Sequence, residues 1–264
     1  MSMQPETPDN DGSEPQAGRG RGGWRFSVTL IVLFVGMAGL AASAAGVSAQ
    51  LLPRKFTTSQ QQQIASWETA RRWRALTAGK IFPASITYQV SSDTLNAGSQ
   101  LALTAYRVGI ARELSCAKAA DAAADRVLSA GRCTALLRAT YADETDSMLV
   151  TVGVAVMPSA GAARSAAGKL SADQEATVRA LGFRGTLAAS FSDRNRQLSW
   201  ATSDGPYVIM TTAGYANGEP QVSVASDPYT DQEMSSVANG IADAVGTPLG
   251  VQPPTPTCPG APGC

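Results

Sequence analysis

Histidine is absent from this chain of 264 residues. Its absence removes the commonest general base, the commonest metal ligand and the side chain that most often changes charge near neutral pH. Few enzymes work without it. We therefore expect a protein that is not an enzyme, with no catalytic, cofactor-binding or metal-binding residues and no cofactor.

An excess of charge of either sign is also missing. The 21 Lys and Arg residues balance the 21 Asp and Glu residues, and no contiguous basic stripe carries the aromatic side chains that stack on bases. This composition argues against nucleic acid as a partner. The hydrophobic fraction of 44% is ordinary for a globular protein, so the chain can build a sizeable core.

Cysteine is scarce, and all four cysteines follow the longest apolar run: Cys116, Cys133, Cys258 and Cys264. An even number on one side of such a run indicates disulfides in an oxidising compartment. Of the three possible connectivities we favour two local bridges. Cys116 with Cys133 closes a loop worth about 3 kcal/mol, and the Pro-Gly pairs between Cys258 and Cys264 favour a small ring. A zinc site is disfavoured because the chain has no C-x-x-C pair and no histidine.

Residues 26–49 form the longest apolar run and carry no charge. As a helix they extend about 36 Å, enough to cross a hydrocarbon core of about 30 Å with some tilt. Basic residues flank both ends, so the positive-inside bias is slight, and the cysteines decide the orientation. We expect one membrane crossing, with the N-terminus cytoplasmic, the C-terminal domain extracytoplasmic and the lipid bilayer as a partner.

The end of the same run leaves another interpretation open. Val47, Ser48 and Ala49, followed by Gln50, have the small-residue form of a signal-peptidase site. Cleavage near Ala49 gives a secreted protein. We favour the uncleaved anchor, because the apolar run is longer than the core of a usual signal peptide.

Periodicity and turn residues predict the elements of the outer part. Helices are expected at 59–78, 116–131, 159–181 (one or two helices) and 230–245, and extended segments at 86–90, 101–110, 134–142, 148–157, 185–192, 198–202 and 207–215. Valines at alternate positions from Val150 to Val156 share one strand face, which we assign to the core. Polar alternates such as Arg138 and Thr140 are expected at the surface.

The predicted helix 59–78 begins at Ser59 as its cap and is a candidate stalk or docking helix. Its apolar residues recur at three-residue spacing: Ile64, Trp67, Ala70, Trp73 and Leu76. It also carries a basic cluster, Arg71, Arg72 and Arg74. A solvated helix face is the commoner meaning of such a cluster, and contact with anionic lipid is the alternative.

The fold class expected is α+β: an N-terminal transmembrane helix, then antiparallel β-hairpins with helices packed on one face, and two local disulfides. The expected organisation, in chain order, is a disordered cytoplasmic tail (1–25), the transmembrane helix (26–49), a linker (50–58), an extracytoplasmic α+β domain (59–246) and a Pro-rich tail with a disulfide ring (247–264).

Three candidate sites are weighed against structural roles. Ser115 and Lys118 match S-x-x-K, but the companion motifs of that family are missing, so we assign Ser115 to helix capping. The acidic turn Asp143, Glu144 and Asp146 lacks calcium-loop spacing and is expected to be solvated. Four aromatic residues suit either a ligand pocket or, by preference, core packing: Trp200, Tyr207, Tyr215 and Tyr229.

Several segments together resemble uncharacterised single-pass membrane-anchored envelope proteins of high-GC actinobacteria. They are Trp67 to Pro83, Gly131 to Tyr141, Val152 to Val156 and the closing Cys258-Pro-Gly-Ala-Pro-Gly-Cys264. The resemblance covers most of the outer part. It implies an envelope location and brings no known activity and no catalytic residue.

The expected function is therefore a membrane-anchored extracytoplasmic interaction or scaffold protein of the cell envelope, with one or more protein partners. An extracytoplasmic module that binds or senses a small molecule is the alternative. A hydrolase using Ser115 and Lys118, or a carboxylate pair, is the second alternative.

Overall fold

The computed structural model describes residues 30–35, 37, 55–91, 100–112, 115–173, 176–220 and 228–252. The chain divides into two units, Met1–Lys55 with Cys258–Cys264, and Phe56–Thr257. In the first unit, residues 30–35 and 37 are helical with exposed side chains, and most of the predicted transmembrane helix lies outside the described residues. Within the described ranges, no helix has both the length and the apolar character that a membrane span requires.

A six-stranded antiparallel sheet forms the centre of the second unit, with strand order β1-β2-β3-β4-β6-β5. The strands are β1 (Ser85–Ser91), β2 (Gln100–Ile110), β3 (Ala135–Asp143), β4 (Met148–Val156), β5 (Leu198–Asp204) and β6 (Tyr207–Tyr215). The expected α+β class and both expected hairpins, β3 with β4 and β5 with β6, are confirmed.

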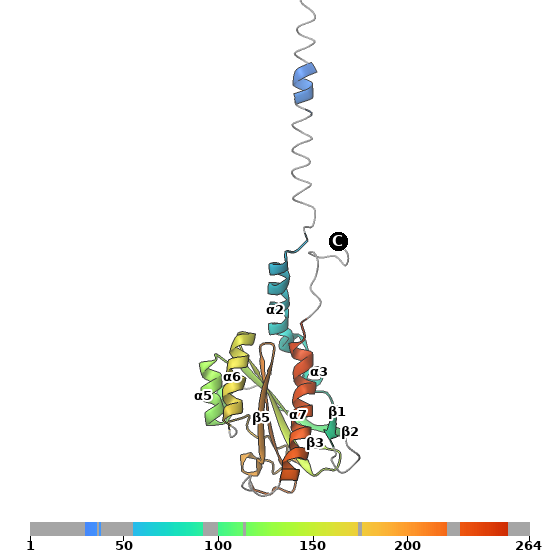
Figure 1. The fold of residues 1–264 in the computed structure, drawn as a ribbon, viewed down its shortest axis with the longest axis vertical. Coiled ribbons are helices and arrows are strands. Elements are labelled where there is room, and N and C mark those ends of the chain that lie inside the picture. Colours follow the sequence, from blue (N-terminus) through green and yellow to red (C-terminus); the bar gives the residue numbers. More distant parts are fainter. Residues whose placement is uncertain are drawn as a thin grey trace, which may run out of the picture. The chain divides into compact units, whose positions relative to one another are not determined.

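Helices cover both faces of this sheet, so the expectation that they collect on one face is wrong (Figure 1). The helices are α2 (Thr58–Ala75), α3 (Ala78–Ile81), α4 (Cys116–Ala119), α5 (Ala122–Ala130), α6 (Ala160–Ala172) and α7 (Pro228–Gly250), with a 3-10 turn at Asp193–Asn195. Residues of α2, α3 and α7 pack on one face, and those of α4, α5 and α6 on the other. Both faces of the central strands are therefore buried.

The valine face of β4 is core, as expected. The alternate residues from Val150 to Val156 all lie in the cluster that α7 covers, beside Met234, Val237 and Ile241 of that helix. The opposite face of β4 is buried as well, because α6 and the segment 176–181 cover it. Alternation therefore assigned the strand correctly but did not reveal that its second face is covered.

Arg138 and Thr140 are buried, with exposed fractions of 7% and 0%, which corrects their expected surface position. Thr140 Oγ1 donates to the Leu181 carbonyl at 2.7 Å and lies 2.9 Å from Thr151 Oγ1, which accepts from the Leu181 amide at 3.0 Å. Arg138 Nη1 donates to the Arg179 carbonyl at 3.3 Å. These polar alternates bind the backbone of an overlying segment instead of water.

Three segments differ from their predicted structure. The predicted helix 159–181 ends at Ala172 in α6, and residues 176–181 are not helical. Residues 185–192 form consecutive turns, not a strand, because the Thr186 hydroxyl donates to the Phe183 carbonyl and accepts from the Ala188 amide. The predicted helix 116–131 is two helices, α4 and α5. Asp121 separates them as the N-cap of α5, accepting from the Ala124 amide at 2.8 Å.

The disulfide between Cys116 and Cys133 is confirmed, with their Cα atoms 6.3 Å apart. It joins the start of α4 to the entry of β3 and lies in the core of the α5–α6 face. The predicted pair Cys258 and Cys264 lies outside the described residues.

Candidate functional site

Helix α2 begins with a capping box, formed by Thr57 and Gln60 and not by the predicted cap Ser59. Its buried residues are Ala65, Thr69 and Trp73, at four-residue spacing, while Trp67 is 59% exposed. The predicted apolar stripe through Trp67 is therefore wrong. The small side chains at 65 and 69 allow a close approach to the domain.

Tyr207 of β6 fastens α2 to the sheet. Its hydroxyl donates to the Thr69 carbonyl at 2.5 Å and accepts from the Trp73 amide at 3.3 Å. This carbonyl and this amide are four residues apart in α2, so the hydroxyl lies between two backbone groups of the helical hydrogen-bond ladder. Burial raises the pKa of Tyr207, opposed by the hydrogen bond from Trp73 and the charge of Arg72. The hydroxyl therefore stays protonated and remains a donor across the physiological pH range.

Arg72 fixes α2 to the far end of the chain. Its Nη1 donates to the carbonyls of Pro248 at 2.9 Å and Leu249 at 3.2 Å, and also to the carbonyl of Val251. These carbonyls lie at the C-terminal end of α7, where the helix dipole and unpaired acceptors favour a cation. Arg72 is thus a helix cap supplied from another helix, not part of a solvated basic face.

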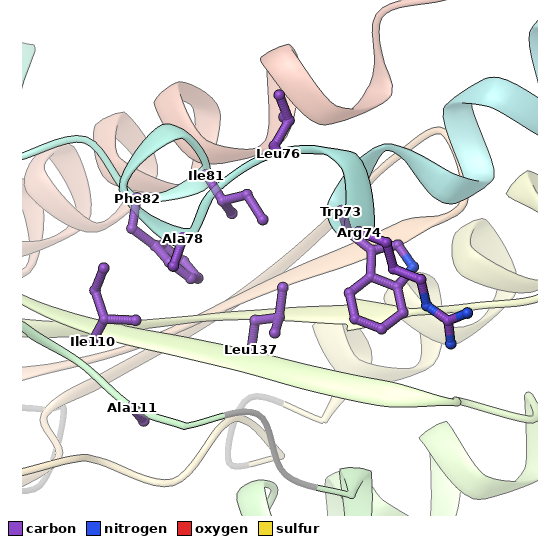
Figure 2. Close-up of a pocket in the computed structure, with 9 residues that line it drawn as sticks. All are labelled: Trp73, Arg74, Leu76, Ala78, Ile81, Phe82, Ile110, Ala111 and Leu137. Atoms are coloured by element: carbon purple, nitrogen blue, oxygen red, sulfur yellow. The ribbon is translucent and has the colours of Figure 1, made fainter.

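A groove of about 440 Å³ opens between the α2–α3 segment and the ends of β2 and β3 (Figure 2). Its lining residues are Trp73, Arg74, Leu76, Ala78, Ile81, Phe82, Ile110, Ala111 and Leu137. We call this the α2–α3 groove. Figure 2 shows the Arg74 guanidinium at one end, next to the Trp73 indole, with Phe82 and Ile110 towards the other end.

The wall of the groove that follows α2 is held in place by two further contacts. Arg107 Nη1 of β2 donates to the Phe82 carbonyl, and the Tyr141 hydroxyl of β3 donates to the Pro83 carbonyl at 2.9 Å. Burial raises the pKa of Tyr141, so this hydroxyl also remains a donor. With Tyr207 at its other end, the α2–α3 segment is fixed to the sheet on both sides of the groove.

The surroundings of the groove are basic. Residues 56–81 contain four basic side chains and one acidic side chain, Glu68, which gives a net charge of +3. The Arg74 guanidinium lies 4.8 Å from the Trp73 ring centroid, and that of Arg71 lies 4.7 Å from the Trp67 ring centroid. Among the described residues no carboxylate forms an ion pair with either arginine.

The S-x-x-K pair does not belong to this groove. Ser115 and Lys118 are exposed at α4, on the opposite face of the sheet. Ser115 occupies the N-cap position but its hydroxyl makes no capping bond, which corrects the expected capping role. The pair lies beside Cys116, whose sulfur is held in the disulfide.

The acidic turn is a structural element, and its first residue is buried instead of solvated. Asp143 is 3% exposed and accepts from the Met148 amide at 2.6 Å and from the Ser147 hydroxyl at 3.1 Å. Glu144 accepts from the Thr104 amide at 2.8 Å, which ties the turn to β2. Within the described ranges no group of three His, Cys, Asp or Glu residues can hold a metal ion.

The predicted aromatic set does not form one pocket. Tyr207 is in the core and holds α2, as described above, whereas Trp200 on edge strand β5 is 44% exposed. Tyr215 packs partly buried against the core that α7 covers. The side chain of Tyr229 lies outside the described set, and none of the other three lines the α2–α3 groove.

Sequence reasoning missed the groove, because its lining comes from three separate segments of the chain and includes no motif. The only signal available was the density of Trp and Arg between positions 67 and 74. The nine lining residues include no acid, hydroxyl or thiol, so the groove offers apolar contact and one cation but no group for proton transfer or nucleophilic attack. Its geometry suits binding.

Comparison of the chain with protein-family models, with curated proteins and with solved structures finds no match in any of the three.

Proposed function

We propose that this protein is a non-enzymatic interaction protein of a cell envelope. Residues 26–49 hold it in the membrane, and the domain that follows lies on the extracytoplasmic side. The charge-free run supports the anchor, and the disulfide between Cys116 and Cys133 supports an oxidising compartment. The proposal also includes a small disulfide ring closed by Cys258 and Cys264. The sequence resemblance to envelope proteins supports the proposed location.

The observation that carries the proposal is the attachment of α2. This helix begins at Thr58, a few residues after the proposed anchor, and Tyr207 and Arg72 tie it to β6 and α7. Helix and sheet therefore move as one body, which suits a scaffold that holds a partner at a fixed position. Trp67 and Arg71 project from α2 away from the sheet and provide an exposed aromatic and cationic contact surface.

The contact surface is tested by photocrosslinking in intact cells. A benzophenone amino acid replaces Trp67 in one full-length variant and Arg164, an exposed residue of α6, in the control. We expect a discrete adduct from position 67 in the membrane fraction and none from position 164. No adduct from position 67, or the same adducts from both positions, would show that α2 is not a partner surface.

The anchor has a separate test. Alkaline carbonate extraction is expected to leave the full-length protein in the membrane pellet, with its original N-terminal residues. A soluble protein that begins at Gln50 would establish secretion after cleavage instead.

A second candidate, an extracytoplasmic module that binds a small molecule, is favoured by the α2–α3 groove. Its volume of about 440 Å³ lies within the range of about 300–1,000 Å³ typical of small-molecule sites. Its walls are fixed by Tyr207, Tyr141 and Arg107. A groove held open in this way costs little reorganisation when it is filled.

A further inference from the structure

We propose that the α2–α3 groove binds an anionic amphiphile, with the acyl chain on the apolar lining and the acidic headgroup at Arg74. The inference rests on the proposed binding function and names the ligand class of that site. Free fatty acids and anionic phospholipids share this chemistry, and the experiment below distinguishes them.

The apolar part of the argument is the lining. Every lining side chain except Arg74 is apolar, and they come from both sides of the groove: Leu76, Ile81 and Phe82 above, Ile110 and Leu137 below (Figure 2). Leu76, Ile110 and Leu137 are only partly buried, so the domain leaves part of this apolar surface in contact with water. An acyl chain gains free energy by covering it, at roughly 25 cal/mol per Å².

The polar part of the argument is the position of the single charge. Arg74 stands at one end of the lining, where its guanidinium rests on the Trp73 ring. No carboxylate in the described part of the chain pairs with it, so its donors can bind an acidic headgroup. The net charge of +3 over residues 56–81 strengthens the preference for an anion. A linear apolar lining that ends in a cation matches an acyl chain that ends in an acidic headgroup. A neutral or cationic headgroup cannot form the ion pair with Arg74.

The test uses quenching of Trp73 by brominated acyl chains. The full-length protein, with Trp24, Trp67 and Trp200 changed to Phe, is placed in phosphatidylcholine nanodiscs, so that Trp73 is the only fluorophore of its type. Three probes are compared: dibromostearic acid, its methyl ester, and phosphatidylglycerol with dibrominated chains incorporated in the disc. Bromine quenches only at close range, so quenching reports a chain beside Trp73.

We expect saturable quenching by at least one anionic probe. The ester should bind at least threefold more weakly, because it lacks the charge that forms an exposed ion pair with Arg74, and such a pair is worth a factor of about this size. The probe that binds identifies the source as free acid or phospholipid. Arg74→Met is expected to weaken binding of the anionic probe by about three- to fivefold and to leave binding of the ester unchanged. Arg71→Met, the control, removes a neighbouring arginine that does not line the groove and should change neither.

Blocking variants test the location. Ala78 is exposed and lines the groove, so Ala78→Phe, which adds bulk without adding a second tryptophan, is expected to abolish quenching by every probe without unfolding the domain. Ala111→Phe fills the groove from the strand side and is used if the first variant loses its far-ultraviolet dichroism. No quenching by any probe, or equal binding of acid and ester in the parent and Arg74→Met proteins, would overturn the proposal. Either failure leaves the crosslinking result at Trp67 unaffected.

Discussion

Replacing Arg72 by Met removes the cap of α7 while keeping an apolar stem of similar length. A hydrogen bond to a charged group typically contributes about 1.5–3 kcal/mol, and a cation at a helix C-terminus about 0.3–1 kcal/mol. Arg72 is half-buried, and one nitrogen serves all three carbonyls of residues 248, 249 and 251, so the contributions do not add in full. We expect a loss of about 2 kcal/mol.

The matched control is Arg71→Met, on the same helix at the adjacent position. Arg71 is exposed and stacks on Trp67, and an exposed contact of this kind is worth about 0.5–1 kcal/mol. The measurement is equilibrium unfolding in urea of the full-length protein under non-reducing conditions, followed by tryptophan fluorescence. For a domain of this size, about 2 kcal/mol corresponds to a fall in Tm of about 4–8 °C.

Hydrogen exchange then locates the effect. Arg72→Met is expected to accelerate exchange at residues 69–76 and 245–251, because both segments lose the contact that joins them. Arg71→Met should leave both protected. Equal losses of stability in the two variants, or wild-type stability in Arg72→Met, would refute the capping role.

Three further outcomes are expected. Cys116→Ser with Cys133→Ser removes a crosslink of sequence separation 17 and should lower the free energy of unfolding by about 3 kcal/mol in urea; an unchanged midpoint would contradict this. Burial, reinforced by a nearby carboxylate, raises the pKa of Asp204, so ionisation costs more in the folded state and stability falls as pH rises through that raised pKa. Asp204→Asn should therefore raise Tm at pH 7 relative to the parent protein, and this difference should disappear at acidic pH. A difference in Tm that stays constant across the pH range would contradict this role of Asp204. Gly240→Ala places a methyl group where the Tyr88 side chain packs on α7, so calorimetry should show a loss of about 1–3 kcal/mol; full stability would mean that α7 and β1 can separate at no cost.

The elements that could be predicted are those whose signal is local. Alternating valines in β4 and turn residues around Asp143 predict a hairpin within a few residues of its observed bounds. The Cys116 and Cys133 pair follows from spacing and short loop length. The covered second face of the sheet could not be predicted, because Arg138 and Thr140 are polar and an alternating polar residue normally indicates solvent.

The candidate site could be predicted only in part. The sequence indicated a docking helix rich in Trp and Arg near position 70, and the groove does begin at Trp73 and Arg74. Three-residue spacing nevertheless selected the wrong face of that helix. Hydrophobicity favoured burial of Trp67, but the close approach to Gly205, where an added Cβ would lie 3.3 Å from Thr69 Cγ2, requires small residues at the contact.

The sequence by itself determined the six strands of the sheet, two of its hairpins and the local crosslink, because alternation, turn chemistry and short loop closure act between residues that are near one another in the chain. The strand predicted at 185–192 is the exception. Only the tertiary structure decided what each polar side chain does. Arg72 meets the end of α7 across 176 residues or more, and Tyr207 reaches α2 across 138. No periodicity records such pairings, since they depend on how separate elements pack.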